Sequence, residues 1–243
     1  MRVIEQSFLS PEENLAFDEA LLNSVEEGAA PDTLRIWESP QPFVVLGVAQ
    51  ILAKEVDEGG CQQAGAPIYR RCSAGGCVVQ GPGSLNFTLA LTHARYPQIK
   101  TIQSAYRYIL PALASALQAH GVPARHEGVS DLAADGLKFS GNAQKRRRRA
   151  ILHHGTLLYD GFDIGLLSQC LREPEDRPGY RQDRTHERFV MRLPLEGAVL
   201  AAVIREAFGA AGVAPSPPLP EELEAMERLA REKYVSAAWI RRR

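Results

Sequence analysis

The chain has 243 residues, a hydrophobic content of 45%, and 28 basic against 29 acidic side chains. This length and composition are sufficient for a buried core of ordinary size. A net charge of -1 excludes a global attraction to nucleic acid or to an anionic membrane. No signal-like segment opens the chain, and no run of about eighteen apolar residues could cross a membrane. We therefore expect a cytoplasmic globular protein with neither nucleic acid nor membrane as partner.

Cysteine usage agrees with a reducing compartment. The four cysteines are widely spread, and none has Cys-x-x-Cys spacing with another. A chain of this length does not need disulfides to be stable. We interpret them as free thiols: Cys61, Cys72, Cys77 and Cys170.

The first half of the chain predicts one helix and several short strands. Ser10 followed by Pro11 and two glutamates is typical of a helix start, and it predicts a helix over residues 11–26. Alternating or continuous apolar residues then indicate strands. These strands are expected at residues 34–37, 43–47, 67–71, 77–80 and 85–91.

The second half predicts longer helices around two further strands. Apolar residues at helical spacing predict a helix over 102–120 that Gly121 ends. Strands are expected at 132–139 and 150–158, with a basic turn at 145–149 between them. Further helices are expected near 163–171, 195–211 and 220–233, after a loop rich in Pro, Arg and Asp at 173–188.

Only one stretch resembles a linker. Residues 216–220 read Ser-Pro-Pro-Leu-Pro, and the segment after them, 221–243, is too short to form a second core. We expect one main domain over residues 1–215 and a helical tail over 216–243 that packs on it.

A first glycine-rich segment, residues 70–79, has the composition of an anion site. Arg71 can bind a phosphate or carboxylate through two parallel hydrogen bonds, and Gly75 and Gly76 let the backbone approach the anion closely. The segment has neither P-loop nor Rossmann spacing. The equally weighted alternative is a hairpin turn whose arginines face water.

A second segment, residues 136–144, places Lys138 between two apolar neighbours and before a turn-prone Ser-Gly-Asn run. A lysine that is partly shielded from water acts strongly on a bound anion. The alternative is a lysine at a strand edge that prevents aggregation. Upstream, Asp131 suits either a magnesium ion or the cap of a turn.

Adjacent histidines and two of the cysteines complete the candidates. His153 and His154 should point to opposite faces of a strand, one into the core and the other into the pocket. Cys77 is expected to line the pocket rather than act as a nucleophile, and Cys170 is expected in the core. The basic run at 145–149 suits a solvated turn or a docking patch for an acidic partner.

Taken together, these segments resemble the lipoate-protein ligase A family, within the biotin and lipoate protein ligases and octanoyltransferases. The family's Arg-Arg-x-Ser-Gly-Gly-Gly-x-Val is similar to residues 70–78, where Ala74 replaces one glycine. Its Asp-Leu-x-x-x-Gly-x-Lys-x-Ser-Gly-x-Ala is similar to residues 131–143, and its His-His-Gly-Thr-Leu-Leu to residues 153–158. Residues 233–239 resemble its closing motif.

The resemblance implies an α+β fold, a mixed and largely antiparallel sheet flanked by helices, of the biotin/lipoate ligase catalytic-domain type. It implies that lipoate is activated with Mg²⁺ and ATP to lipoyl-AMP, with Lys138 as the catalytic residue. The lipoyl group then passes to a lysine of an acceptor lipoyl domain or a glycine-cleavage H-type protein. No tightly bound prosthetic group is expected.

The resemblance also implies which residues form the site. Arg71, Gly76 and Lys138 would bind lipoate, and Asp131 would hold magnesium. For the acyl chain we expect a hydrophobic slot formed by Val44, Leu46 and Val78. The residues expected at ATP and lipoyl-AMP are Arg71, Ser73, Gly75, Gly76, Cys77, Val78, Val79, Asn86, Ser140, Gly141, His154, Gly155 and Thr156.

Longer members of the family carry a C-terminal domain that helps to form the adenylate. We expect it to be absent here or supplied by a separate accessory ligase subunit. One alternative is an octanoyltransferase, which moves an octanoyl group from acyl carrier protein through a cysteine thioester. Relatives of that kind have their cysteine shortly before the region of Asp131, where residues 125–130 hold none, or well after the His-Gly segment. Cys170 falls only near the latter position and aligns better with a residue of a helix core. A second alternative is a lipoate-handling protein without catalysis.

Overall fold

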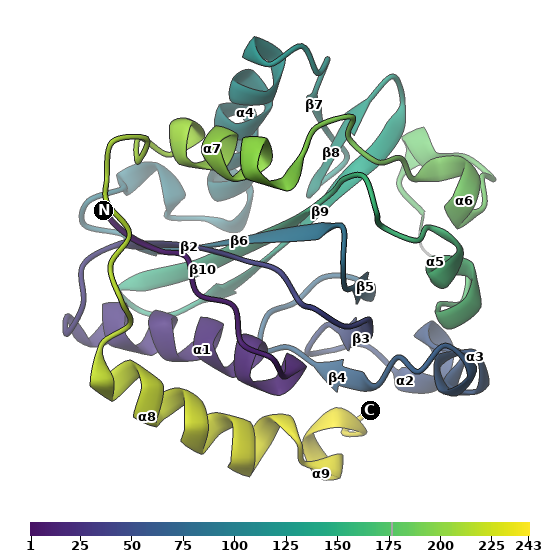
Figure 1. Cartoon of the computed structure of the whole chain (residues 1–243), viewed down its shortest axis with the longest axis horizontal. Coiled ribbons are helices and arrows are strands. Elements are labelled where there is room, and N and C mark those ends of the chain that lie inside the picture. The colour runs from purple at the N-terminus through teal and green to yellow at the C-terminus, as the bar shows by residue number, and fades with distance from the viewer. Residues whose placement is uncertain (176) are drawn as a thin grey trace.

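A seven-stranded sheet runs through the middle of the molecule in the order β1-β2-β6-β10-β9-β8-β7 (Figure 1). The structure is a computed structural model that describes residues 1–175 and 177–243. All neighbouring strands in this sheet are antiparallel except β1 and β2, which are parallel. The strands are β1 Arg2–Ile4, β2 Thr33–Trp37, β6 Ser84–Thr92, β7 Arg125–Glu127, β8 Asp131–Ala134, β9 Leu137–Arg146 and β10 Ala150–Leu158.

A second sheet of three strands lies on the same side of the large sheet as the first helix (Figure 1). Its order is β4-β3-β5, with β3 parallel to β4 and antiparallel to β5. Its strands are β3 Phe43–Leu46, β4 Ile68–Arg70 and β5 Val78–Gln80. The glycine-rich segment connects β4 to β5, so it lies at the end of this small sheet.

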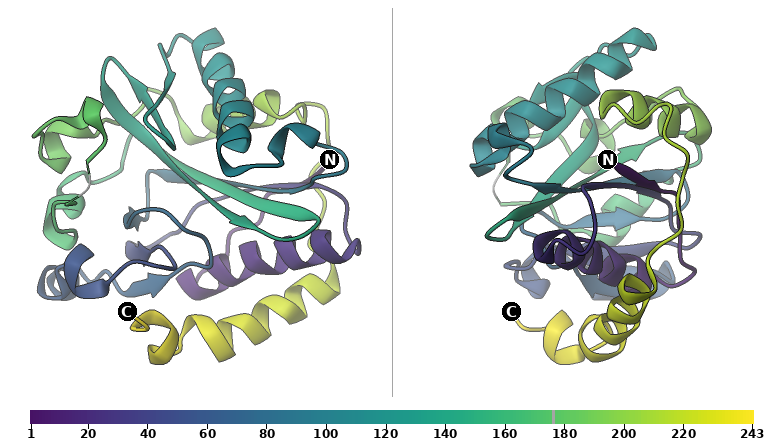
Figure 2. Two further views of the ribbon diagram at one scale, coloured as in Figure 1. Left: turned by 180° about the vertical axis from the view of Figure 1, so that it is seen from behind. Right: turned by 90° about the vertical axis from the view of Figure 1, so that its left-hand side faces the viewer.

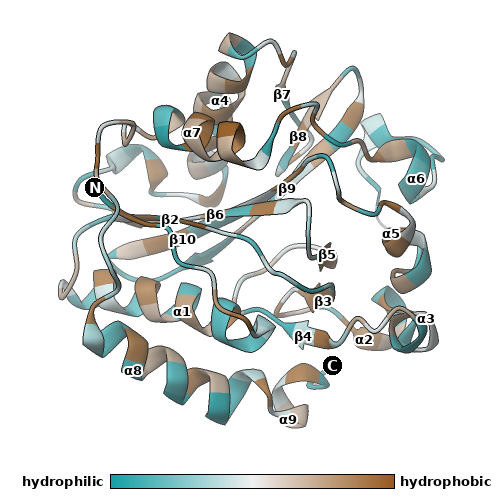
Figure 3. Ribbon diagram, in the orientation of Figure 1, coloured by the Kyte–Doolittle hydropathy of each residue, from teal (hydrophilic) through white to brown (hydrophobic). Residues whose placement is uncertain are grey.

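Helices cover both faces of the large sheet, as the two further views show (Figure 2). One face packs against α4 Ile102–Ala119 and α7 Gly197–Ala207, and the other against α1 Pro11–Glu27. Outside α1 lies α8 Pro220–Leu229, which carries both hydrophilic and hydrophobic residues (Figure 3). The shorter helices are α2 Leu52–Glu55, α3 Glu58–Gln63, α5 Gly165–Cys170, α6 His186–Phe189 and α9 Ala237–Ile240.

The start of α1 forms as its sequence predicts. The Ser10 hydroxyl accepts a hydrogen bond from the Glu13 amide at 3.4 Å, and Pro11 is the first helical residue. At the other end Gly28 adopts a φ of 78°, a left-handed conformation that favours glycine. Between these ends the buried side chains of Leu15 and Phe17 face the large sheet.

The C-terminal tail binds back onto α1 and onto β4. Lys233 Nζ and the Tyr234 hydroxyl both donate to the buried Glu19 carboxylate, at 2.6 and 2.7 Å. The indole nitrogen of Trp239 donates to the Arg70 carbonyl at 2.8 Å, at the end of β4. The tail therefore packs on the rest of the chain and holds the strand that leads into the glycine-rich segment. The division at residue 215 stays a prediction.

One predicted strand was wrong. Residues 132–139 form parts of two strands, β8 and β9, because Asp135 and Gly136 make a tight turn with φ values of 50° and 76°. Positive φ at both central residues of a two-residue turn is the geometry that joins antiparallel strands. The basic run also begins inside β9, so that only residues 147–149 form the turn.

Several elements were missed because they are too short to show a period. These are β1, β7, the short helices α2, α3, α6 and α9, and single turns of 3-10 helix at Pro97–Ile99 and Gly179–Arg181. A π-helical turn at Ala230–Tyr234 follows α8. The predicted loop 173–188 thus contains some helix, and its residue Asp176 lies outside the described residues. Among the described residues, no helix has both the length and the apolarity that crossing a bilayer demands.

His153 is buried in the core without a polar partner. Its ring lies against those of Phe87 and Tyr106, with centroids 5.9 and 5.6 Å away, and neither ring nitrogen has a hydrogen-bond partner among the described residues. Burial, followed by the charge of His154, lowers the pKa of His153 from 6.5 to about 3. His153 is therefore a neutral core residue at physiological pH.

This burial predicts a pH dependence of stability. Between pH 6.5 and 3 the unfolded chain protonates His153 while the folded chain does not, so the free energy of unfolding falls as the pH falls. From pH 7 to pH 5 the loss is about 2 kcal/mol. His153→Leu should remove this loss in urea unfolding measured at both pH values. The control His120→Gln, at a partly exposed histidine paired with Glu206, should keep the wild-type pH dependence. An unchanged slope in His153→Leu would contradict the prediction.

Candidate active site

A cavity lies between the two sheets. It encloses about 100 Å³ and adjoins a second cavity of about 520 Å³. Gly75 borders the second cavity, whereas Ser73, Val79 and Ser140 are buried and border neither. The other predicted site residues line the first cavity: Arg71, Gly76, Cys77, Val78, Asn86, Asp131, Lys138, Gly141, His154, Gly155 and Thr156. The structure thus brings the three distant motifs to one place.

Lys138 supplies a positive charge where the two cavities meet. Its ammonium contacts Asp131 Oδ1 at 2.8 Å, and 29% of its side chain is exposed. A Cβ on Gly141 would lie 3.3 Å from the ammonium nitrogen, so the glycine leaves room for the lysine to cross the sheet surface. Lys138 is therefore a partly shielded cation, as the sequence predicted, with a counter-ion beside it.

Asp131 is held from two sides. Besides Lys138, the Tyr180 hydroxyl donates to its second carboxylate oxygen at 2.8 Å. Burial and the charge of Asp131 raise the pKa of Tyr180, so the phenol keeps its proton and remains a donor. Sequence reasoning missed Tyr180, because no pattern in the 173–188 loop connects it to Asp131.

The surroundings of Asp131 do not fit a free magnesium ligand. Both carboxylate oxygens already have partners. Among the described residues, no group of three or more His, Cys, Asp or Glu side chains could hold a metal ion. Magnesium bound with a nucleotide uses one or two carboxylates together with phosphate oxygens. The geometry gives the predicted metal role no support, and no chemical step below depends on it.

Arg71 binds its own loop rather than facing an empty pocket. Its Nε donates to Ser73 Oγ at 2.9 Å, and its Nη2 donates to the carbonyls of Ala74 and Gly76 at 2.6 and 2.8 Å. Its Nη1 also reaches the Val45 carbonyl at 3.4 Å. These contacts leave one of the five guanidinium protons uncommitted. The geometry therefore does not favour the expected binding of an anion through two parallel hydrogen bonds from Arg71.

The backbone of the same loop is available for an anion. With the carbonyls of residues 74 and 76 turned toward Arg71, no acceptor among the described residues is paired with the amides of Gly75, Gly76 and Cys77. Gly75 has a φ of 87°, and a Cβ on Gly47 would lie 2.0 Å from the Gly75 carbonyl oxygen. Successive free amides in such a turn form an anion-binding concavity.

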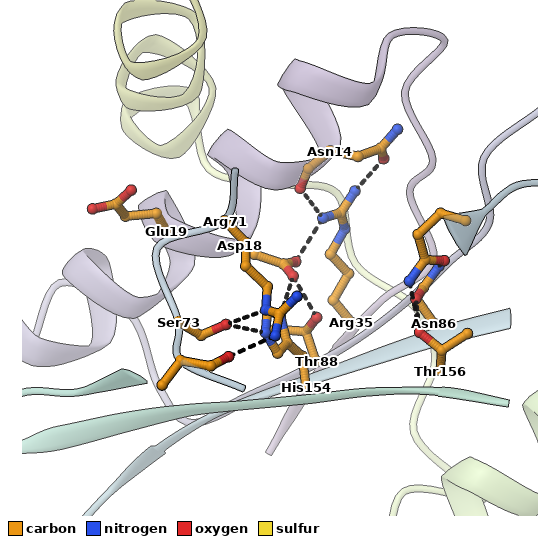
Figure 4. A network of polar contacts seen from close by, with 12 residues as sticks. Asn14, Asp18, Glu19, Arg35, Arg71, Ser73, Asn86, Thr88, His154 and Thr156 are labelled. Atoms are coloured by element: carbon orange, nitrogen blue, oxygen red, sulfur yellow. Dashed lines mark hydrogen bonds and ion pairs between the residues drawn. The ribbon is translucent and has the colours of Figure 1, made fainter. Parts of the chain in front are cut away.

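A line of hydrogen bonds connects this loop to the core (Figure 4). Ser73 Oγ lies 2.6 Å from His154 Nε2, and His154 Nδ1 lies 3.1 Å from Asp18 Oδ2. Asp18 also accepts from Arg35 at 2.7 Å and from Thr88 at 2.9 Å. Burial raises the pKa of Asp18, but its contacts with His154 and Arg35 together lower the pKa by more than burial raises it. The pKa of Asp18 therefore lies below the ordinary value of 3.8. Sequence reasoning missed Asp18, whose place in α1 looked like scaffold.

A ring of three hydrogen bonds lies on the cavity wall (Figure 4). Gln80 donates to the Thr156 hydroxyl at 2.7 Å, the hydroxyl donates to Asn86 Oδ1 at 2.7 Å, and Asn86 donates back to Gln80 at 2.9 Å. Because these groups satisfy one another, the wall can face an apolar ligand at little cost.

Of the four cysteines, all of them free thiols, Cys77 alone lines the first cavity. Cys61, Cys72 and Cys170 are buried, with the last in the core as predicted. Burial raises the pKa of the Cys77 thiol to about 12, although the charge of Arg71 opposes the shift. At neutral pH Cys77 is therefore almost entirely a thiol, which is a weak nucleophile.

The expected apolar slot was partly wrong. Val78 lines the cavity, but Val44 and Leu46 belong to the core cluster that includes α2, α3 and α5. Neighbouring residues of a strand point to opposite faces, so Val45 faces the cavity instead. Leu15 from α1 and Trp37 from β2 complete its apolar surface.

The basic turn lies far from Lys138. Lys138 and Lys145 are on the same strand, and seven residues of strand span about 23 Å. Arg146 donates to the carbonyls of Ile99 and Lys100, and Arg147 donates to Asn23. These contacts favour the interpretation as a local turn, and the docking role stays a prediction.

The loop conformation predicts different costs for alanine at the two glycines. A Cβ at Gly75 would meet Arg71 Nη2 at 3.0 Å in a left-handed backbone, whereas a Cβ at Gly76 meets nothing within 4 Å. Gly75→Ala should therefore lower the free energy of unfolding by about 1–2 kcal/mol more than Gly76→Ala, as urea unfolding would show. Equal costs would mean that the loop does not hold this conformation.

Comparison with known proteins identifies the family. The lipoyl protein ligase A/B catalytic domain matches residues 10–194. An octanoyltransferase LipM from Geobacillus kaustophilus is 27% identical, covering 98% of this chain and 96% of its own, and one from Kyrpidia tusciae is 31% identical, covering 93% of each. A putative lipoate-protein ligase A from Aeropyrum pernix is 33% identical, over 61% of this chain and 54% of its own.

Solved structures show the same fold. A lipoate-protein ligase A bound with ATP superposes with a TM-score of 0.85 at 24% identity, covering 99% of this chain and 98% of its own. A bi-partite lipoate protein ligase from Thermoplasma acidophilum has a TM-score of 0.84 at 21% identity, covering 99% of this chain and 95% of its own. The predicted α+β fold with its largely antiparallel sheet is thus confirmed. The chain belongs to the lipoyl protein ligase A/B catalytic-domain family.

Proposed function

We propose that this protein transfers a lipoyl or octanoyl group to a lysine of an acceptor protein domain, with an acyl adenylate made from ATP as the first candidate donor. The observation that carries the proposal is the position of Lys138. Lys138 borders both the partly apolar first cavity and the second cavity, and the loop whose amides have no partner among the described residues borders them too. An acyl-AMP needs these three features together, because it has an apolar chain, an electrophilic carbonyl and a phosphate.

One row of residues across the large sheet gives the acyl chain a path. Gly141 pairs with Thr156, Thr156 with Asn86, and Asn86 with Trp37. Strands lie about 4.8 Å apart, so Asn86 is about 10 Å and Trp37 about 14 Å from Gly141, beside Lys138. An extended eight-carbon chain is about 9 Å long, from C–C bonds of about 1.5 Å. A carboxyl group at Lys138 would therefore place the end of the chain near Asn86.

The chemistry follows from the charges. A carboxylate oxygen attacks the α-phosphorus of ATP, a new P–O bond forms, and pyrophosphate leaves. The acceptor amine then attacks the carbonyl carbon, a C–N bond forms, and AMP leaves with the electrons of the broken C–O bond. Lys138 would reduce the repulsion between carboxylate and phosphate in the first step and stabilise the carbonyl oxygen in the second.

The second candidate is an octanoyltransferase that forms a cysteine thioester. The comparisons favour it, because the relatives that match this chain over nearly its whole length bear that name. The site favours the adenylate instead, since burial keeps Cys77 protonated and residues 125–130 hold no cysteine. If the octanoyltransferase is correct, Cys77 is the thiol that the cavity offers.

The acceptor in either case is a folded protein domain with an exposed lysine. One structural neighbour was studied with its E2 lipoyl domain, and that neighbour is bi-partite. We accordingly propose a lipoyl domain or an H-type protein as acceptor, and a separate accessory subunit as a partner in adenylate formation. Four free thiols agree with action in the cytoplasm.

Two substitutions separate the candidate donors. With lipoate, ATP and the accessory subunit present, the wild type should release pyrophosphate, and Lys138→Ala should lower that rate at least about tenfold. Lys145→Ala, on the same strand but bordering neither cavity, is the matched control and should keep the wild-type rate. Cys77→Ser should remain active. Transfer from octanoyl carrier protein without ATP, abolished by Cys77→Ser, would instead establish the octanoyltransferase.

Trp37 should set the length of the acyl chain. Trp37 lies at the end of the row of paired residues along which the acyl chain is proposed to lie. Trp37→Ala should therefore raise the ratio of kcat/KM for twelve-carbon acids to that for eight-carbon acids by at least about tenfold. The control Tyr108→Ala removes an exposed aromatic side chain from α4 and should leave the chain-length profile unchanged. An unchanged profile in Trp37→Ala would place the acyl chain elsewhere.

A further inference from the structure

We propose that Asp18, acting through His154 and Ser73, is a positioning residue that keeps the glycine-rich loop in its anion-binding shape. The inference rests on the proposed function for the identity of the anion, a phosphate or carboxylate of the acyl donor. Its structural part depends only on the hydrogen bonds that run from α1 to the loop.

Asp18 determines the first hydrogen bond of the line. Its carboxylate can only accept, so the His154 nitrogen at 3.1 Å, Nδ1, must carry a proton. The other ring nitrogen, Nε2, lies 2.6 Å from Ser73 Oγ; it accepts the hydroxyl proton when the ring is neutral and donates to the oxygen when the ring is charged. In both states Ser73 Oγ accepts the Nε proton of Arg71 at 2.9 Å. The line therefore fixes the position of Arg71.

The order Asp, His, Ser is also that of a hydrolase triad, but this serine is no nucleophile. Ser73 is fully buried and borders neither cavity. Its hydroxyl is engaged with His154 at 2.6 Å, and its oxygen accepts the Nε proton of Arg71. Because both His154 nitrogens are occupied, His154 has no free nitrogen for a substrate proton. The arrangement therefore serves to position groups.

At its fixed end the line begins at a buried ion pair. Asp18 is 1% exposed and receives hydrogen bonds from Arg35 on β2 and Thr88 on β6. Arg35 is fully buried, with its guanidinium carbon 4.8 Å from the ring centre of Phe17 and 4.9 Å from that of Trp37. Separating this buried pair would leave an uncompensated charge, so Asp18 stays in place.

At its other end the line determines which loop groups face the ligand. Arg71, oriented by Ser73, draws the carbonyls of Ala74 and Gly76 toward itself. The amides of Gly75, Gly76 and Cys77 are then left for the anion. If Asp18 no longer fixes His154, Arg71 gains freedom and the carbonyls can turn toward the cavity, where they would repel an anion.

The test compares two substitutions of a buried carboxylate by a carboxamide. Asp18→Asn removes the carboxylate at the fixed end of the line. Glu222→Gln removes a carboxylate on α8 that binds Arg2 on β1 and has no contact with the glycine-rich loop. Both variants should lose stability. Only Asp18→Asn should weaken binding of an acyl-sulfamate analogue of octanoyl-AMP, by at least about tenfold in titration calorimetry.

Two further readouts do not depend on catalysis or on the analogue. Nitrogen-15 spectra of the imidazoles should show His154 protonated at Nδ1 in the wild type and in Glu222→Gln, and changed in Asp18→Asn. Crystal structures should show the carbonyls of residues 74 and 76 turned from Arg71 in Asp18→Asn alone. Equal effects of the two variants, or a wild-type His154 protonated at Nε2 alone, would overturn the inference.

These readouts separate the two proposals. If the wild type uses neither acyl donor and does not bind the analogue, the proposed function fails, while the spectra and the loop positions still decide the role of Asp18. If the wild type is active and Asp18→Asn keeps its loop shape and affinity, the proposed function stands and the positioning role is refuted.

Discussion

The buried ion pair between Arg35 and Asp18 is the constraint on which the site depends. It joins β2 of the large sheet to α1, and three aromatic rings surround its cation. Removing two charges from water is costly, and the cost is offset only when geometry and additional hydrogen bonds are good. Here the carboxylate also accepts from Thr88 and His154, so both of its oxygens have partners.

From that pair, a line of hydrogen bonds runs through His154 and Ser73 to Arg71 in the glycine-rich loop. Strand β10 of the large sheet supplies His154, the loop that follows β4 supplies Arg71, and Ser73 in the same loop connects them. The cavity wall is thus rigid where it carries polar groups and apolar where it faces the chain of a ligand. Lys138, the partly exposed cation, is held by Asp131, whose second oxygen binds Tyr180 from a different segment.

Much of the fold could be predicted from the sequence, because α1, α4 and the long strands have clear periods and caps. The residues that the sequence motifs singled out, among them Lys138, Gly141, His154 and Thr156, line one cavity, and their roles stay predictions. What failed depended on tertiary contacts. The sequence of β3 does not show which of its two faces borders the cavity. Val44 and Leu46 were therefore predicted to line the acyl-chain slot, whereas Val45 lines it in the structure. Arg71 was predicted to bind a ligand, but it donates to carbonyls of its own loop. Backbone carbonyls are present at every residue, so a sequence pattern cannot show which of them a side chain will bind.

The contact between Trp239 and the Arg70 carbonyl joins residues 169 positions apart. During synthesis the strand that enters the glycine-rich loop leaves the ribosome long before its indole partner does. Its reciprocal bond, from the Arg70 guanidinium to the Ile240 carbonyl at 2.9 Å, arrives equally late. The loop therefore reaches its final support only when translation of this stretch is finished, and the core cluster around α1, which includes Met226, Ala230 and Tyr234 of the tail, is completed at the same late stage.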